Sequence, residues 1–117
     1  MWNLFYARSD PYLLNVGVNE LQVKFEVDTG SPVTIMSKQE YVKIGSMDQV
    51  NQSLGKKLRT YTGSVVNLLG VAKVLVDLQG MRRELEVHVV QDVGPNLLGR
   101  DWIKNHPRWK TPNEKAE

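Results

Sequence analysis

The chain has 117 residues, a net charge of +2 and no cysteine, with 41% hydrophobic and 24% charged residues. This length suits one domain that buries roughly two-thirds of its unfolded surface, and the composition is that of an ordinary globular protein. The small net charge gives no support for a nucleic-acid partner, and the lack of cysteine excludes disulfides and thiolate metal sites. No apolar run approaches the ~20 residues that span a bilayer, and no secretory signal is visible, so we expect neither a membrane partner nor export.

The first half of the chain is predicted to form strands around one acidic loop. Residues 1–10 fit either an edge strand or an upstream linker. Pro11–Val18 and Leu21–Val27 are predicted as strands joined by a turn, and Thr34–Met36 continues the sheet. Between them lies Asp28-Thr29-Gly30, which puts one carboxylate in a tight loop between buried strands.

The acidic loop has two interpretations. A buried carboxylate is costly unless it is hydrogen-bonded or paired. Thr29 supplies a donor, and Gly30 lets backbone amides turn toward the acid, so Asp28 fits a catalytic aspartate. Asp and Gly also favour turns, so an ordinary turn between two strands remains open on the tripeptide alone.

Beyond the loop, the pattern predicts one short helix and a polar connection. Ser37-Lys38-Gln39-Glu40 is a capping box, which predicts a helix that starts at Ser37. Gly45 is expected to end it. Residues 46–55 are predicted as a polar loop.

Two hairpins are predicted next. Lys57–Tyr61 and Val65–Leu69 form the first, with Thr62-Gly63-Ser64 at its tip. Val71–Leu78 and Glu84–Val90 form the second.

The end of the chain is predicted to hold one more helix. Arg100–Asn105 fits a short helix, and Trp102 is expected to anchor it in the core. Residues 107–117 are polar and are expected to be a tail or linker, so the folded domain is predicted to span 11–106.

Three motifs in order resemble the retropepsins, the dimeric aspartic proteases of retroviruses and LTR retrotransposons. They are Asp28-Thr29-Gly30-Ser31, Thr60-Tyr61-Thr62-Gly63, and Leu97-Leu98-Gly99-Arg100-Asp101. The Thr60–Gly63 motif is similar to the flap of proteases from gypsy-type LTR retrotransposons. The resemblance covers residues 11–103, most of the chain.

The resemblance implies an all-β, retropepsin-like closed barrel with a flap hairpin and one short C-terminal helix, active as a homodimer. The implied activity is that of an aspartic endopeptidase without a cofactor, acting on an extended peptide, with the Gag-Pol polyprotein as the natural substrate. The implied location is cytoplasmic, within retrotransposon virus-like particles as one setting. The implied site residues are Asp28, Thr29 and Gly30 for catalysis; Ser31, Tyr61, Thr62 and Gly63 for substrate; and Gly99, Arg100 and Asp101 for structural support.

A single Asp-Thr-Gly predicts that two chains build the site. Peptide hydrolysis by carboxylates alone needs one to accept a proton from water and another to hold a proton near the carbonyl. Two such acids share one proton because they cannot both ionise at close range. Asp92-Val93-Gly94 lacks the hydroxyl residue of Asp-Thr-Gly and stands just before a Gly-Pro turn, so a turn role is favoured for Asp92. Asp28 is therefore expected at a two-fold axis, where by resemblance Thr29 bonds across to its partner.

Two positions depart from the retroviral pattern. Ser31 stands where many retroviral enzymes have alanine, and its hydroxyl is expected to donate to Asp28 and favour the ionised form. Pro32 replaces the acid that pairs with the arginine of Gly-Arg in those relatives, which leaves the partner of Arg100 open.

Other interpretations stay open. The chain could be a retropepsin-like dimerisation or peptide-binding module with little catalysis, for example a host-domesticated copy, or a monomeric β domain in which Asp28 only caps a turn. Tyr61 fits a flap residue and a plain strand aromatic equally well. His88 and His106 lie in different predicted elements, so no metal site is expected.

Overall fold

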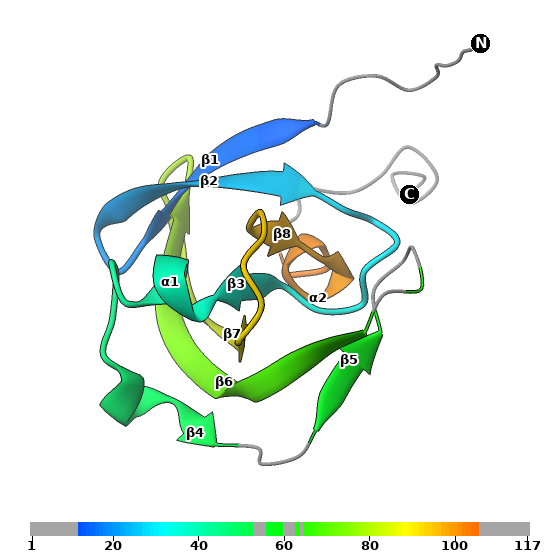
Figure 1. Ribbon diagram of the computed structural model, residues 1–117. Helices are drawn as coiled ribbons and strands as arrows, with labels where there is room; N and C mark the ends of the chain where they lie inside the picture. Colours follow the sequence, from blue (N-terminus) through cyan, green and yellow to red (C-terminus); the bar gives the residue numbers. More distant parts are fainter. Residues whose placement is uncertain (1–11, 53–55, 60–62, 64, 106–117) are drawn as a thin grey trace, which may run out of the picture.

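A computed structural model describes residues 12–52, 56–59, 63 and 65–105, which form a strand-rich domain (Figure 1). The strands are β1 (Leu13–Val18), β2 (Leu21–Val27), β3 (Ile35–Ser37), β4 (Asn51–Gln52), β5 (Lys57–Arg59), β6 (Val65–Leu78), β7 (Met81–Val90) and β8 (Leu97–Leu98). The helices are α1 (Lys38–Tyr41), the 3-10 helix η2 (Met47–Gln49) and α2 (Arg100–Ile103). In these described ranges no helix has the length and apolarity to cross a membrane.

The main sheet closes on itself. Its strands run in the order β1-β2-β8-β3-β7-β6-β4, and β1 also pairs with β6 through Gly17 opposite Asp77 and Val18 opposite Val76. The pairs β2–β8 and β3–β7 are parallel, whereas β1–β2 and β6–β7 are antiparallel hairpins. The predicted closed barrel with a short C-terminal helix is therefore confirmed.

The turn between β1 and β2 is fixed from two sides. Asn19 and Glu20 have positive φ angles of 51° and 73°, as the tight turn of a two-residue hairpin requires. The Asn19 side chain accepts a 2.9 Å hydrogen bond from the Leu75 amide and donates one of 3.0 Å to the carbonyl of Ile44. One asparagine thus ties the hairpin to β6 and to the segment after α1.

The main core lies inside the barrel and is built from the inward faces of the long strands. Phe25 of β2 is fully buried, and its ring lies 5.3 Å from that of Trp102, which is 1% exposed. The Trp102 indole donates a 2.7 Å hydrogen bond to the Glu86 carbonyl, which satisfies its polar atom. The predicted core role of Trp102 is confirmed, and it fixes α2 against the sheet.

Residues 65–78 form one strand, which corrects the prediction of separate strands at Val65–Leu69 and Val71–Leu78. β6 has 14 residues, and its pairing with β7 shifts register between Leu68 and Gly70. This bulge lets one strand pair with β5 at one end and with β7 at the other. A Cβ on Gly70 would lie 2.3 Å from the Asn51 carbonyl oxygen, so glycine allows β4 to approach here.

Smaller differences concern where elements begin and end. The Ser37 hydroxyl accepts a 3.2 Å bond from the Glu40 amide, so the predicted cap is confirmed, although the helix itself ends at Tyr41 and the chain reaches Gly45 in turns. The segment predicted as a loop contains η2 and β4. α2 ends at Ile103, two residues earlier than predicted, and β7 begins at Met81, three residues earlier.

Candidate active site

Asp28 lies directly after β2, and three hydrogen bonds define its loop. The Asp28 amide donates 2.9 Å to the Leu98 carbonyl, and its own carbonyl accepts from the Ser31 amide at 3.0 Å. The Gly30 amide donates 3.0 Å to Oδ1 of the carboxylate. The residue is half-buried, and within the described residues no cation forms an ion pair with it. The loop therefore fixes the carboxylate while leaving it in reach of solvent.

Gly99 and Arg100 pack against this loop, and Arg100 hydrogen-bonds to its backbone. A Cβ on Gly99 would lie 2.3 Å from the Val33 carbonyl oxygen, so only glycine fits between the two backbones. The Arg100 amide donates 2.8 Å to the Ser31 carbonyl, and its guanidinium Nη1 donates 2.9 Å to the Thr29 carbonyl. A backbone carbonyl of the loop is thus the partner of Arg100 that the sequence left open.

A buried hydroxyl connects the loop to the C-terminal helix. Thr34 is fully buried, and its Oγ1 donates 2.7 Å to Asp101 Oδ1 while accepting 3.0 Å from the Gly99 amide. The same carboxylate oxygen accepts 2.8 Å from the Trp102 amide. This role of Thr34 was not predicted from the sequence. The available signal was a lone hydroxyl residue in an apolar run, since a buried hydroxyl needs a partner.

The expected bond from Ser31 to the Asp28 carboxylate is wrong. Ser31 is 2% exposed, and its hydroxyl donates 2.7 Å to the carbonyl of Val33. A hydroxyl has one proton to donate, so this bond leaves none for Asp28. The turn of the loop, which brings the Val33 carbonyl to the serine, decides the contact.

The predicted flap is a hairpin of β5 and the first part of β6, with Leu58 opposite Val66. Gly63 has a φ of +93°, which suits the tip of such a hairpin, and its carbonyl accepts 3.4 Å from Arg59. Tyr61 and Thr62 lie outside the described residues. The structure therefore brings Gly99, Arg100 and Asp101 to the acidic loop, and Gly63 sits on the separate hairpin.

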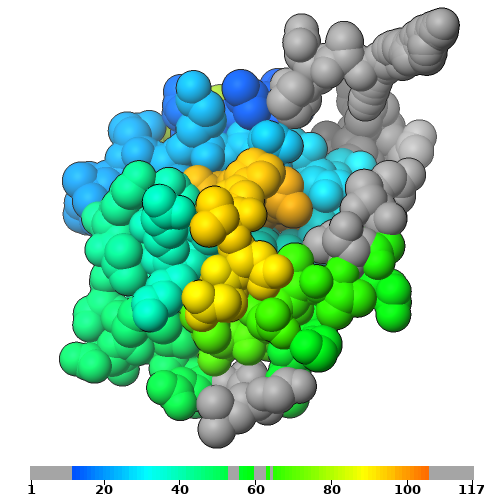
Figure 2. All heavy atoms as spheres, in the orientation of Figure 1, coloured from blue at the N-terminus to red at the C-terminus, as the bar shows by residue number. Residues whose placement is uncertain are grey.

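A second, smaller apolar cluster lies apart from the main core. It connects residues next to the acidic loop with the β5–β6 hairpin and with the end of β7. Its buried members are Ile35, Leu68 and Val90, with Val33, Leu58, Val66 and Leu97 packed against them. Residues 91–96, which lead from β7 to β8, run across the front of the molecule between the α1 side and the β5–β6 hairpin (Figure 2).

The other acidic candidate has a structural role. Asp92 Oδ1 accepts a 3.0 Å hydrogen bond from the Asn67 amide, which fits the turn role expected for it. In the part of the chain that the structure describes, no group of three or more His, Cys, Asp or Glu could hold a metal ion. Of these two acidic residues, Asp28 is therefore the candidate for the catalytic carboxylate.

No protein-family model matches the sequence, and no curated protein matches it either. Solved structures do resemble it. The EIAV protease complexed with the inhibitor HBY-793 has a TM-score of 0.69 and 17% identity, over 87% of this chain and 93% of that one. The retroviral protease-like domain of Ddi1 from Leishmania major has a TM-score of 0.65 and 22% identity, over 85% and 79%. A retropepsin-like aspartic protease from Rickettsia conorii has a TM-score of 0.59 and 19% identity, over 81% and 69%. The chain has the fold of the retropepsin-like aspartic proteases.

Proposed function

We propose that the protein is an aspartic endopeptidase, active as a homodimer in which Asp28 of each chain contacts one water molecule. The observation that carries the proposal is the braced Asp28 loop. Gly30 donates to one carboxylate oxygen, Oδ1, and Arg100 holds the loop through the Thr29 carbonyl. A general base needs a fixed position and access to the proton it removes, and this loop supplies both.

The proposed dimer follows from the count of carboxylates that the reaction requires. Asp92 is engaged with the backbone of Asn67, which favours a second chain as the source of the second acid. Across a two-fold axis the same residue supplies both halves of the site. The exposed side chain of Thr29 is free to reach the partner loop. One carboxylate then takes a proton from water while the other, protonated, donates toward the peptide carbonyl.

The proposed substrate is an extended peptide that lies between the loop and the β5–β6 hairpin. Such a peptide binds by strand-like hydrogen bonds, with alternate side chains entering pockets. The second apolar cluster offers an apolar wall there, because it contains Ile35 next to the loop and Val66 on the hairpin. We therefore expect a preference for apolar side chains near the cleaved bond. The Gag-Pol polyprotein of a gypsy-type element is the proposed natural substrate, on the strength of the Thr60–Gly63 motif.

The test is the initial rate of peptide-pool cleavage at mildly acid pH, measured against protein concentration with and without pepstatin. A rate that rises faster than linearly at low concentration and is blocked by pepstatin is expected, because dimers form as concentration rises. Asp28→Asn should fold and dimerise like the wild type and cleave nothing, since one substitution removes both acids.

Each other outcome points elsewhere. Full activity in Asp28→Asn would overturn the assignment of the catalytic acid. A folded dimer without cleavage at any concentration would favour the peptide-binding module, and a folded monomer without cleavage would favour a turn role for Asp28. Analytical ultracentrifugation of the same samples separates these last two cases.

A further inference from the structure

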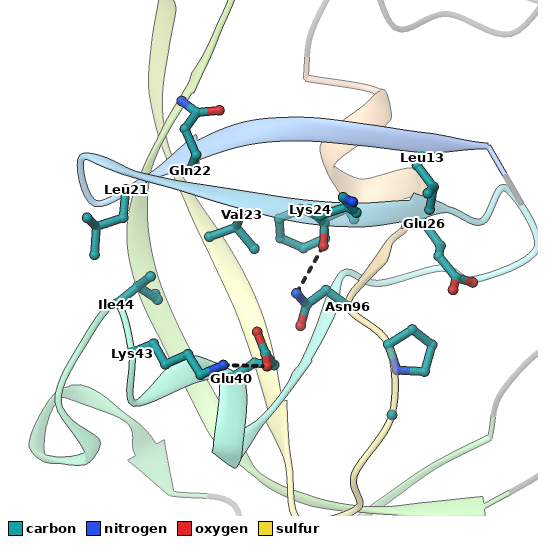
Figure 3. Close-up of a pocket in the computed structure, with 13 residues that line it drawn as sticks. Leu13, Leu21, Gln22, Val23, Lys24, Glu26, Glu40, Lys43, Ile44 and Asn96 are labelled. Carbon is teal, nitrogen blue, oxygen red and sulfur yellow. Dashed lines mark hydrogen bonds and ion pairs between the residues drawn. The ribbon is translucent and has the colours of Figure 1, made fainter.

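A groove of about 570 Å³ lies along β2, outside the candidate active site. Its volume is within the range of roughly 300–1,000 Å³ that bound ligands occupy. Figure 3 shows β2 on one side, Ile44 and the Lys43–Glu40 pair on the other, and Asn96 between them, bonded to Lys24 of β2. No residue from 27 to 37 lines the groove, so it is separate from the Asp28 loop.

The direction of the backbone groups in β2 follows from its pairing with β1. The Val27 amide donates 2.8 Å to the Tyr12 carbonyl, which makes Val27 a residue that bonds toward β1. Backbone groups of successive residues point to opposite edges of a strand. The amides and carbonyls of Gln22, Lys24 and Glu26 therefore point away from β1, to the outer edge.

The partners on this outer edge change step by step. Glu26 pairs with β8, and its amide donates 2.8 Å to the Asn96 carbonyl. One step back, the Lys24 carbonyl accepts 3.0 Å from the Asn96 side-chain amide, which replaces a strand. At the next step, none of the described strands pairs with Gln22 on this side, and the groove lies in front of it.

The walls of the groove are suited to an uncharged chain. Leu21 is 50% exposed at its open end, and Ile44 is half-buried across from it. The charged lining residues are two lysines and two glutamates, of which Lys43 and Glu40 are paired with each other at 3.0 Å, so the walls carry little net charge. The outward amide and carbonyl of Gln22, which no described strand pairs with, are complementary to the backbone of an extended peptide.

We propose that this groove binds an extended, mainly apolar peptide segment of a partner protein, which pairs with the backbone of Gln22 and continues the line of β8. The paired stretch of the peptide would end at Asn96, because the side chain and carbonyl of Asn96 already bond to the edge at Lys24 and Glu26. The proposal is independent of the Asp28 chemistry.

The test follows amide shifts of the isotope-labelled full chain with pepstatin present, on addition of a blocked heptapeptide of alternating valine and threonine between terminal lysines. We expect shifts at Gln22 and Lys24. Gln22→Pro removes only an outward-facing N–H, which an edge strand tolerates, and should weaken binding at least about fivefold, the effect of about one hydrogen bond. The control Gln22→Ala keeps the N–H and should bind like the wild type.

A further probe covers the case in which Gln22→Pro does not fold. The same heptapeptide with alternate backbone nitrogens methylated, along either edge in turn, should lose affinity for one methylation pattern only. Equal binding of both patterns, equal affinity of the two folded variants, or shifts confined to Asp28–Gly30 would overturn the proposal. So would slow hydrogen exchange of the Gln22 amide in peptide-free protein, since the chain itself or a second copy would then cover the edge.

Discussion

The hydroxyl of Thr34 and the carboxylate of Asp101, 67 positions apart in sequence, are joined by a 2.7 Å hydrogen bond inside the protein. Because the same hydroxyl accepts from the Gly99 amide, it ties the segment just before β3 to the first turn of α2. The shape of the Asp28 loop therefore depends on residues well outside Asp-Thr-Gly.

Thr34→Val should lower the free energy of unfolding by about 1–3 kcal/mol, because it keeps the side-chain volume but removes the acceptor of the Gly99 amide and one of the two donors to Asp101 Oδ1. Urea unfolding followed by tryptophan fluorescence measures the loss. Thr34→Ser, which keeps the hydroxyl, is the matched control and should lose less. Equal stability of the serine and valine variants would contradict the role of the hydroxyl.

Gly99→Ala should destabilise the fold by about 1–3 kcal/mol or more, because the added methyl would meet the Val33 backbone and neither side can move without breaking the loop bonds. Gly94→Ala is the control, since a Cβ there meets nothing within 4 Å. Thermal melts of both variants decide the point, and a Gly99→Ala protein as stable as Gly94→Ala would show that the close approach is not rigid.

Ser31→Ala should leave the pH dependence of peptide cleavage unchanged, because the Ser31 hydroxyl donates to the Val33 carbonyl and not to Asp28. It should instead cost about 1 kcal/mol of stability, the net value of a lost hydrogen bond. The pH–rate profiles of the two proteins, recorded with one peptide, provide the measurement. A displaced acid limb in the variant would mean that the hydroxyl reaches the carboxylate during the reaction.

The free energy of unfolding is expected to fall at alkaline pH because of Tyr41. The side chain is fully buried, and burial raises the pKa of its phenol above the usual 10.0. The unfolded chain then ionises first, so the stabilisation is complete below about pH 10 and is lost as the pH rises through the folded-state pKa. Urea unfolding from about pH 8 to 11 should show a steeper decline for the wild type than for Tyr41→Phe. Parallel curves would contradict the prediction.

Local patterns in the sequence predicted much of this fold. In β2, Val23 and Phe25 are buried while Gln22 and Lys24 are exposed, as period-two alternation indicates. The cap at Ser37 follows from side-chain chemistry within four residues. The association of the Asp28 loop with Gly99 spans most of the chain, and only the resemblance to a known family suggested it.

The contacts that the sequence did not predict depend on the path of the backbone. From the sequence, the Ser31 hydroxyl could donate to the Asp28 carboxylate or to a neighbouring backbone carbonyl. The turn of the loop selects the carbonyl of Val33. Thr34 has the β-branched shape of its apolar neighbours, so the pattern hides its polar role. The partner of Arg100 is a backbone carbonyl, that of Thr29, which no side-chain motif encodes.

The bulge in β6 has a consequence for which side of the sheet each residue faces. In a regular strand, residues with even numbers would all face the same side. Val66 and Leu68 nevertheless belong to the second cluster, whereas Ala72 and Val74 belong to the main core. The extra residue reverses the facing of the strand at this point. If the ladder ran evenly through all of β6 with Leu69 in place, Val66 and Leu68 would instead share the face of Ala72 and Val74, away from the second cluster. The bulge thus determines whether the hairpin turns its apolar surface toward the acidic loop or away from it.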